Sequence, residues 1–143
     1  KQSVAAIVET KGNPNGHIIL RGANSGPNYH EESVEAAAVK LQQAKLPPRL
    51  MIDCSHGNSS KKPERQPLVA RDIAGQIARG SQYIFGVMIE SHLNGGSQKL
   101  HNPKDLQYGT SITDACLAFD ESMTVLEHLA ESVRSRRSLH TAS

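Results

Sequence analysis

The sequence predicts an α/β fold built around parallel strands. Three short apolar runs, centred on Ile19, Ile52 and Val87, each end in polar or charged side chains and a loop rich in Gly, Asn and Ser. Each run is followed by a segment whose apolar residues recur at helical spacing. Continuous apolar runs are typical of buried parallel strands, and their alternation with helices favours right-handed crossovers. The 143 residues suffice for one compact domain.

In the first part of the chain, the sequence predicts one strand between two helical segments. An apolar pattern indicates the end of a helix, with Val4, Ala5, Ile7 and Val8 as its apolar positions. Because the chain starts inside this pattern without a Met, we expect it to belong to a longer chain. Residues 12–16 form a loop, and residues 17–22 form a strand that stops at Arg21. Residues 33–45 have helical spacing up to the Pro47-Pro48 stop.

The second and third strands each lead to a candidate functional side chain. Residues 50–52 form the second strand, which ends at His56, and residues 64–79 form the helix that follows. The third strand covers residues 83–89 and ends at Glu90. Gly80, between that helix and that strand, is a plausible residue for closing the helix.

The last part of the chain predicts a functional loop and a final helix. Residues 94–108 exceed the usual length of a connecting loop. Asp120 can cap the helix that follows. The residues expected to face inward are Met123, Leu126, Ala130 and Val133. We expect one domain over residues 1–137 and a disordered tail over residues 138–143. Three strand–helix units cannot close an eight-stranded barrel, so this order alone also fits an open three-layer sheet.

Composition excludes some classes of protein. The net charge of +2 is too small, and the basic residues too scattered, to indicate a nucleic-acid partner. No apolar run approaches the roughly 20 residues of a membrane-spanning helix, so no membrane partner is expected. Cys54 and Cys116 lack paired spacing, which favours two reduced thiols in a cytoplasmic protein.

His56 and Glu90 indicate a shared metal site. Parallel strands bring their carboxyl ends to the same edge of a sheet, and Asp114 can add a third ligand from the loop before the last helix. One imidazole with two carboxylates suits Mn, Fe, Co or Zn. In the alternative interpretation no metal binds: His56 is a hydrogen-bonded histidine at the rim of the sheet, Glu90 is a surface carboxylate, and Asp114 is a residue at the start of a helix. The spacing alone leaves both interpretations open.

Two basic residues lie at the same edge. Arg21 can grip a phosphate or carboxylate with its planar guanidinium, or it can pair with a neighbouring carboxylate. Lys61 can join an anion site or remain a solvated surface lysine. Strand alternation predicts that the side chains of Asp53 and His56 diverge unless the strand bends, and the favoured interpretation of Asp53 is a buried acceptor packed behind the barrel wall. His92 suits a supporting position better than ligation.

Five motifs, in this order, resemble the C-terminal part of a type I 3-deoxy-D-arabino-heptulosonate 7-phosphate (DAHP) synthase. They are HIILRG at 17–22, PNY at 27–29, MIDCSHGNSSK at 51–61, GVMIESHL at 86–93 and YGTSITDAC at 108–116. The resemblance runs from residue 1 to about residue 137. It implies that the chain forms strands six to eight, with their helices, of a (β/α)8 TIM barrel.

The resemblance also implies a function. Members of this family condense phosphoenolpyruvate with erythrose 4-phosphate, with release of phosphate, in the first step of the shikimate pathway. They require a divalent metal ion. His56, Glu90 and Asp114 match three of the family's four metal ligands, and Arg21 matches an arginine that binds the phosphate of phosphoenolpyruvate. A homo-oligomer, either a dimer or a tetramer, is implied for the full-length enzyme.

The departures from the family limit what these 143 residues are expected to do alone. The cysteine that is the family's fourth ligand belongs to an early strand, and neither Cys54 nor Cys116 occupies that position. The early basic residues that hold the two substrates are also outside this sequence. We therefore expect the isolated chain to be inactive. The alternatives are an octulosonate-phosphate synthase, which condenses phosphoenolpyruvate with another sugar phosphate, and a non-catalytic remnant that binds metal or phosphate.

Overall fold

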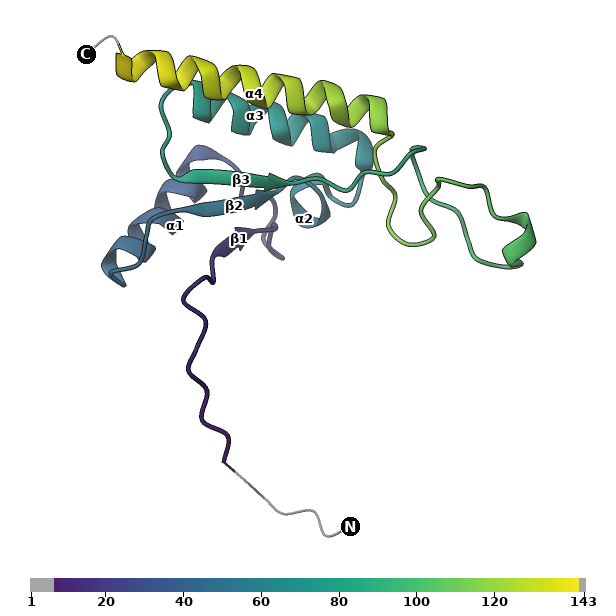
Figure 1. Cartoon of the computed structure of the whole chain (residues 1–143), viewed down its shortest axis with the longest axis horizontal. Helices are drawn as coiled ribbons and strands as arrows, with labels where there is room; N and C mark the ends of the chain where they lie inside the picture. The colour runs from purple at the N-terminus through teal and green to yellow at the C-terminus, as the bar shows by residue number, and fades with distance from the viewer. Residues whose placement is uncertain (1–6, 142–143) are drawn as a thin grey trace.

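The computed structural model describes residues 7–141, with side chains through residue 139. Its strands β1 (Ile18–Leu20), β2 (Leu50–Asp53) and β3 (Ile84–Met88) form one parallel sheet in the order β1-β2-β3 (Figure 1). The longer helices are α1 (Glu31–Gln43), α3 (Gln66–Ala78) and α4 (Phe119–Thr141). A short helix α2 (His56–Ser59) and two 3₁₀ turns, Pro63–Arg65 and Pro103–Asp105, lie in the connections. The α/β class and the three parallel strands predicted from the sequence are confirmed.

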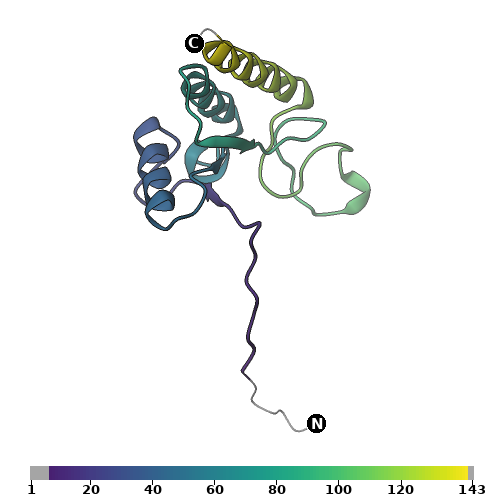
Figure 2. The ribbon, with the colours of Figure 1, turned by 60° about the vertical axis from the view of Figure 1, so that its left-hand side comes forward.

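The core lies on one face of the sheet. Leu50 and Ile52 of β2 are completely buried there, against Val34 of α1, Ile73 of α3 and Val125 of α4. In both views α3 and α4 lie side by side, and α1 lies beside the sheet, apart from this pair (Figures 1 and 2). Alternation along the strands places Ile19 and Met51 on the opposite face. Ile19 remains 48% exposed there, because no described helix covers that face.

The strand register contains one irregularity. Leu50 pairs with Ile84, whereas Met51 pairs with Gly86, so Phe85 is an extra residue in β3. Gly86 leaves room at the next position, since a side-chain carbon there would lie 3.3 Å from the end of the Met51 side chain. The extra residue returns Val87 to the face that packs against the core.

The helices α1 and α3 follow the sequence pattern. Glu31 and Glu32 lie in the first turn of α1, where carboxylates interact favourably with the helix dipole. Gly80 follows α3 with a positive φ of 109°, a conformation that glycine adopts at low cost. The expected closure of this helix by Gly80 is confirmed.

The helix α4 presents a different face to the core than its sequence pattern predicts. Its buried apolar residues are Val125 and Leu129, whereas Met123 and Leu126 are 41% and 49% exposed. Ala130 is also exposed, and Val133 of the expected set is partly buried against the core. Two apolar stripes run along this helix, and contact with α3 selects the one that contains Val125.

The two ends of α4 also differ from the expectation. Asp120 is inside the first turn, and the backbone N–H of Ala118 is instead accepted by Glu121 at 3.0 Å. The helix continues through Thr141, so residues 138–141 are not a disordered tail. The Ser138 hydroxyl donates to the Arg134 carbonyl at 3.1 Å in this last part of the helix. Residues 142–143 lie outside the described residues.

The start of the described chain is extended rather than helical. Residues 7–16 contain no helix and run away from the sheet in both views (Figures 1 and 2). Ile7 and Val8 are almost fully exposed, with no described neighbour to stabilise a helical turn. The expected helix end is therefore absent at Ile7 and Val8, while Val4 and Ala5 lie outside the described residues. Within residues 7–141, no helix combines the length and apolar character that crossing a membrane would require.

Candidate metal centre

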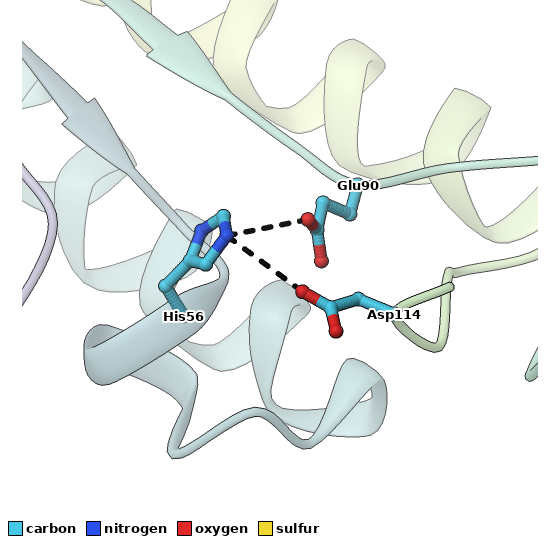
Figure 3. Close-up of side chains that lie close together, drawn as sticks. All are labelled: His56, Glu90 and Asp114. Carbon is cyan, nitrogen blue, oxygen red and sulfur yellow. Dashed lines mark ion pairs between the residues drawn. The ribbon is translucent and has the colours of Figure 1, made fainter.

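Three ligand-capable side chains converge beyond the carboxyl ends of β2 and β3. His56 Nε2 lies 3.4 Å from Glu90 Oε1 and 3.9 Å from Asp114 Oδ2. One ligand atom from each residue lies within 4.8 Å of both others. Figure 3 shows the imidazole edge facing the two carboxylates. The sequence predicts that these three residues meet, and the structure brings them together.

His56 is placed by an abrupt turn at the end of β2. The strand stops at Asp53, and His56 begins α2 with a positive φ of 45°, which is uncommon for a non-glycine residue. The turn packs closely against the end of β1. A side-chain carbon on Gly22 would lie 2.5 Å from the carbonyl carbon of Gly57, so only glycine fits there. Asn58 fixes the same junction by donating to the carbonyls of Leu20 at 3.0 Å and Asp53 at 2.8 Å.

The relationship between Asp53 and His56 corrects one expectation. Strand alternation predicts diverging side chains, but Asp53 Oδ2 lies 2.7 Å from His56 Nδ1. The alternation no longer applies because the strand ends at Asp53 and the chain has turned before residue 56. Asp53 is a buried acceptor, as expected, with 2% of its surface exposed. Its carboxylate lies at the site, in contact with His56.

Glu90 is held through both its side chain and its backbone. The Ser55 hydroxyl donates to Glu90 Oε2 at 2.7 Å. Gln66, at the start of α3 and completely buried, donates to the Glu90 carbonyl at 3.0 Å and accepts the Glu90 N–H at 2.9 Å. Neither residue was expected from the sequence. A role for Ser55 at the site could be suspected from the sequence because Ser55 directly precedes His56. Nothing in the sequence around Gln66 indicates that it contacts Glu90.

Asp114 reaches the site because the long connection between β3 and α4 folds back on itself. The backbone of Leu117 donates to the Glu90 carbonyl at 3.0 Å, and Gly96 exchanges two backbone hydrogen bonds with Cys116 at 2.8 and 3.0 Å. These contacts place residues 114–117 beside the end of β3. Figure 1 shows the connection extending beyond the carboxyl edge of the sheet, with the 3₁₀ turn Pro103–Asp105 within it. Gly96 belongs to the long loop expected over residues 94–108, and through it this loop pairs with the segment that carries Asp114.

The donor set fits a divalent first-row metal ion. Two atoms bonded to one such ion at about 2.0–2.2 Å each lie no more than about 4.4 Å apart. The distances of 3.4 and 3.9 Å from His56 Nε2 meet that limit. Among the described residues, His56 is the one basic side chain within 4.0 Å of Glu90 or Asp114. Two adjoining carboxylates without a nearby Lys or Arg repel one another, and a bound cation would relieve that repulsion.

The two predicted basic residues are placed differently. Arg21 follows β1, and its Nε lies 3.8 Å from Asp53 Oδ2, while 64% of its side chain remains exposed. Both interpretations of Arg21 are thus compatible with its position, because an exposed guanidinium beside a carboxylate can still bind an anion. Lys61 is exposed, and its backbone N–H donates to the His56 carbonyl at 2.8 Å. Its place in an anion site stays a prediction.

Three further side chains near the site do not belong to the ligand group. His92 is exposed, and its Nδ1 accepts the Leu93 N–H at 2.8 Å. Burial raises the pKa of Cys54 to about 12, with a smaller contribution from the Asp53 carboxylate. The pKa of Cys116 is also raised, chiefly by burial, although a hydrogen bond with Ser111 opposes the rise. Both cysteines are free thiols.

Comparison with known proteins identifies the family. The profile described as the DAHP synthetase I family matches residues 1–127. A putative phospho-2-dehydro-3-deoxyheptonate aldolase from Schizosaccharomyces pombe is 54% identical over 96% of this chain. The phospho-2-dehydro-3-deoxyheptonate aldolase of Haemophilus influenzae is 48% identical over 93% of it.

A solved structure is similar as well. The phospho-2-dehydro-3-deoxyheptonate aldolase of Francisella tularensis SCHU S4 matches 92% of this chain with a TM-score of 0.85 and 52% identity. The chain spans 38% of the length of that protein and 38% and 37% of the S. pombe and H. influenzae relatives. A profile match over most of the sequence, with high identity to named members, shows that the chain belongs to the DAHP synthetase I family.

Proposed function

We propose that the protein is a phospho-2-dehydro-3-deoxyheptonate aldolase, or DAHP synthase. The reaction would condense phosphoenolpyruvate with erythrose 4-phosphate and release phosphate, at the start of aromatic amino-acid biosynthesis. The observation that carries the proposal is the convergence of His56, Glu90 and Asp114 in a chain of this family. The names of the relatives support the heptulosonate product over the octulosonate alternative. The converging ligand set supports an enzyme over a remnant.

We further propose that the three strands belong to a (β/α)8 barrel. Three features support this: the parallel order β1-β2-β3, helices packed on one face, and an opposite face that no described helix covers. Val87, Ile89, Phe119, Met123 and Leu126 line a shallow apolar groove between β3 and α4. A further strand and helix from the rest of the barrel would cover this groove.

Each site residue has a role in this proposal. His56 Nε2, Glu90 and Asp114 would hold the metal ion, with Mn, Fe, Co and Zn all compatible with the donors. When bound, the ion supplies Lewis-acid polarisation of the aldehyde or a water of lowered pKa. Arg21 would bind the phosphate of phosphoenolpyruvate through two parallel hydrogen bonds. Lys61 would add a positive charge for the same anion or for the second phosphate.

The substrate assay tests this function in the whole protein. We expect condensation of phosphoenolpyruvate and erythrose 4-phosphate, measured as phosphate release, to stop on treatment with EDTA and to return when Mn²⁺ is added. His56→Ala should abolish the reaction. His92→Ala is the matched control, since His92 is a neighbouring exposed histidine outside the ligand group. Condensation that persists in His56→Ala, or that resists metal removal, would contradict the proposal.

Three further expectations accompany the proposed function. The 143 residues by themselves should not catalyse the condensation, because the family's fourth metal ligand and its early substrate-binding residues are not among them. Metal-dependent condensation by this isolated chain would overturn that expectation. We also propose a homo-oligomer, a dimer or tetramer, for the whole enzyme. A cytoplasmic location is supported by the two free cysteines, since oxidising compartments favour disulfides.

A further inference from the structure

We propose that Asp53 is a positioning residue that serves both halves of the site. Its carboxylate would hold the His56 ring in the tautomer that can ligate a metal ion, and it would also anchor the Arg21 guanidinium. The inference rests on the proposed function, because it assigns the support for that same metal centre. It is carried by the contacts of one buried carboxylate with two side chains from different segments.

The contact with His56 determines which ring nitrogen is available. Asp53 Oδ2 lies 2.7 Å from His56 Nδ1, and the Asp53 residue is only 2% exposed. An ionised carboxylate can only accept hydrogen bonds, so in a neutral His56 ring the proton lies on Nδ1. The lone pair of Nε2 is then free, and Nε2 is the atom that faces Glu90 at 3.4 Å and Asp114 at 3.9 Å. This is the arrangement in which a carboxylate orients a metal-ligating histidine.

Asp53 is itself held in place by hydrogen bonds to its side chain and its backbone. Its Oδ1 accepts the backbone N–H of Ser55 at 2.8 Å. Its backbone carbonyl accepts a hydrogen bond from Asn58, which is 4% exposed. Asn58 also accepts the Asn28 N–H at 2.8 Å. The carboxylate therefore projects from a fixed junction of β1, β2 and α2, and little conformational freedom remains to be lost when His56 binds an ion.

The same Asp53 oxygen atom that contacts His56 also lies near Arg21, the residue predicted to bind a phosphate. Asp53 Oδ2 lies 3.8 Å from Arg21 Nε, the guanidinium nitrogen that is nearest the main chain. Because 64% of the Arg21 side chain is exposed, its terminal nitrogens remain available to an anion. One carboxylate thus contacts Nδ1 of the metal ligand at hydrogen-bond distance and Nε of the arginine at ion-pair distance. Removal of its charge should weaken both the metal and the phosphate interaction.

Asp53→Asn is the sharpest substitution, since asparagine keeps the shape of the side chain and changes its hydrogen-bonding capacity. If the amide nitrogen faces His56, Nδ1 must become the acceptor and the ring proton moves to Nε2, which can then no longer ligate. If the amide oxygen faces His56, the amide nitrogen opposes the Ser55 N–H, and two donors meet. Either orientation should lower metal affinity, by about 10- to 100-fold.

The matched control is Asp72→Asn. Asp72 Oδ2 also lies near a histidine nitrogen, 3.6 Å from His30 Nδ1, but this pair is outside the metal group. Metal affinity would be measured by calorimetric titration of Mn²⁺ into the metal-free whole protein. Phosphoenolpyruvate affinity would be measured separately. We expect Asp53→Asn to reduce both affinities and Asp72→Asn to change neither.

The tautomer itself can be measured without metal. Long-range ¹H–¹⁵N spectra distinguish the protonated from the unprotonated ring nitrogen, and His56→Gln identifies the His56 signals. We expect Nδ1–H in the wild type and a change in Asp53→Asn, whereas a purely structural role would leave the ring signals unmoved. Wild-type His56 with its proton on Nε2, or unchanged Mn²⁺ affinity in folded Asp53→Asn, would overturn the inference. If the wild type binds no Mn²⁺ although Nδ1 is protonated, the proposed metal centre fails and the tautomer assignment stands.

Discussion

Gln66 pairs with both hydrogen-bonding groups of the Glu90 backbone, in the manner of a neighbouring strand. Its Nε2 donates to the Glu90 carbonyl at 3.0 Å, and its Oε1 accepts the Glu90 N–H at 2.9 Å. The strand β3 ends two residues earlier, at Met88, so Glu90 has left the sheet ladder. The first residue of α3 therefore fixes the backbone from which a candidate metal ligand projects.

Replacement of Gln66 should cost stability and metal affinity together. Gln66→Met keeps a similar length but leaves the Glu90 N–H without a partner and the Glu90 carbonyl with only the Leu117 N–H, which we expect to cost about 1–3 kcal/mol. Equilibrium unfolding in urea measures this cost. Gln43→Met, at the exposed end of α1, is the control and should change the free energy of unfolding by less than about 0.5 kcal/mol. Similar losses in the two variants would show that Gln66 does not hold Glu90.

The contact between Gly22 and Gly57 should be intolerant of even one methyl group. Gly22→Ala adds a carbon 2.5 Å from the Gly57 carbonyl carbon and also requires a positive φ of 87°. Gly96 has a similar φ of 82° and no atom within 4 Å of the added carbon. We expect a loss of about 1–2 kcal/mol for Gly96→Ala from the backbone alone. Gly22→Ala should lose about 3 kcal/mol or more, because the close contact adds to that cost.

Thermal unfolding of the two glycine variants measures the difference. Gly22→Ala should also weaken phosphoenolpyruvate binding, since Gly22 directly follows Arg21. Equal stability of Gly22→Ala and Gly96→Ala would mean that the junction of β1 and α2 can open without cost, and that the close contact does not restrict residue 22 to glycine.

The two cysteines should react at different rates. Cys54 is completely buried, and its pKa of about 12 keeps it protonated at neutral pH. Cys116 is only partly buried, so in the folded protein it should react before Cys54 with a disulfide reagent at about pH 8, although its own raised pKa slows the reaction. The second thiol should appear only on unfolding in urea. Cys116→Ser should remove the early reaction and Cys54→Ser the late one, and rapid modification of Cys54 in the folded protein would contradict its burial.

Cys54 also gives a pH dependence of stability. Its pKa is raised in the folded state, from 9.0 to about 12, so the folded protein retains a proton that the unfolded chain releases at alkaline pH. The contribution is fully present below about pH 9 and is lost as the pH rises toward 12. Stability of the wild type should therefore fall more steeply over this range than that of Cys54→Ala. Parallel pH profiles of urea unfolding for the two proteins would contradict the raised pKa.

The meeting of His56 and Glu90 could be predicted from the sequence because each follows an apolar run that is typical of a parallel strand. Such strands bring their carboxyl ends together whatever the rest of the chain does. Asp114 could be proposed from its residue type, but its position depends on backbone pairing between residues 90–98 and 111–117. No local pattern encodes that pairing.

Other features depend on tertiary contacts that a sequence pattern does not contain. Asp53 and His56 meet because the strand ends between them, and alternation holds only within a strand. The stripe of α4 that contains Val125 is buried because α3 packs against it, while the equally apolar Leu126 faces outward. Gln66 is a polar residue at a helix start, and only the position of the Glu90 backbone shows what it does.

Metal binding by His56, Glu90 and Asp114 underlies the proposed function, and a Co²⁺ titration of the metal-free whole protein, followed by visible absorption, tests it most directly. We expect one ion per chain in the wild type and a loss of at least about tenfold in affinity for Glu90→Gln, which keeps the side-chain shape but removes its charge. Glu35→Gln, an exposed carboxylate of α1 outside the ligand group, should bind Co²⁺ like the wild type. Unchanged Co²⁺ affinity and spectrum in Glu90→Gln would show that the ion binds elsewhere and would contradict the proposed metal centre.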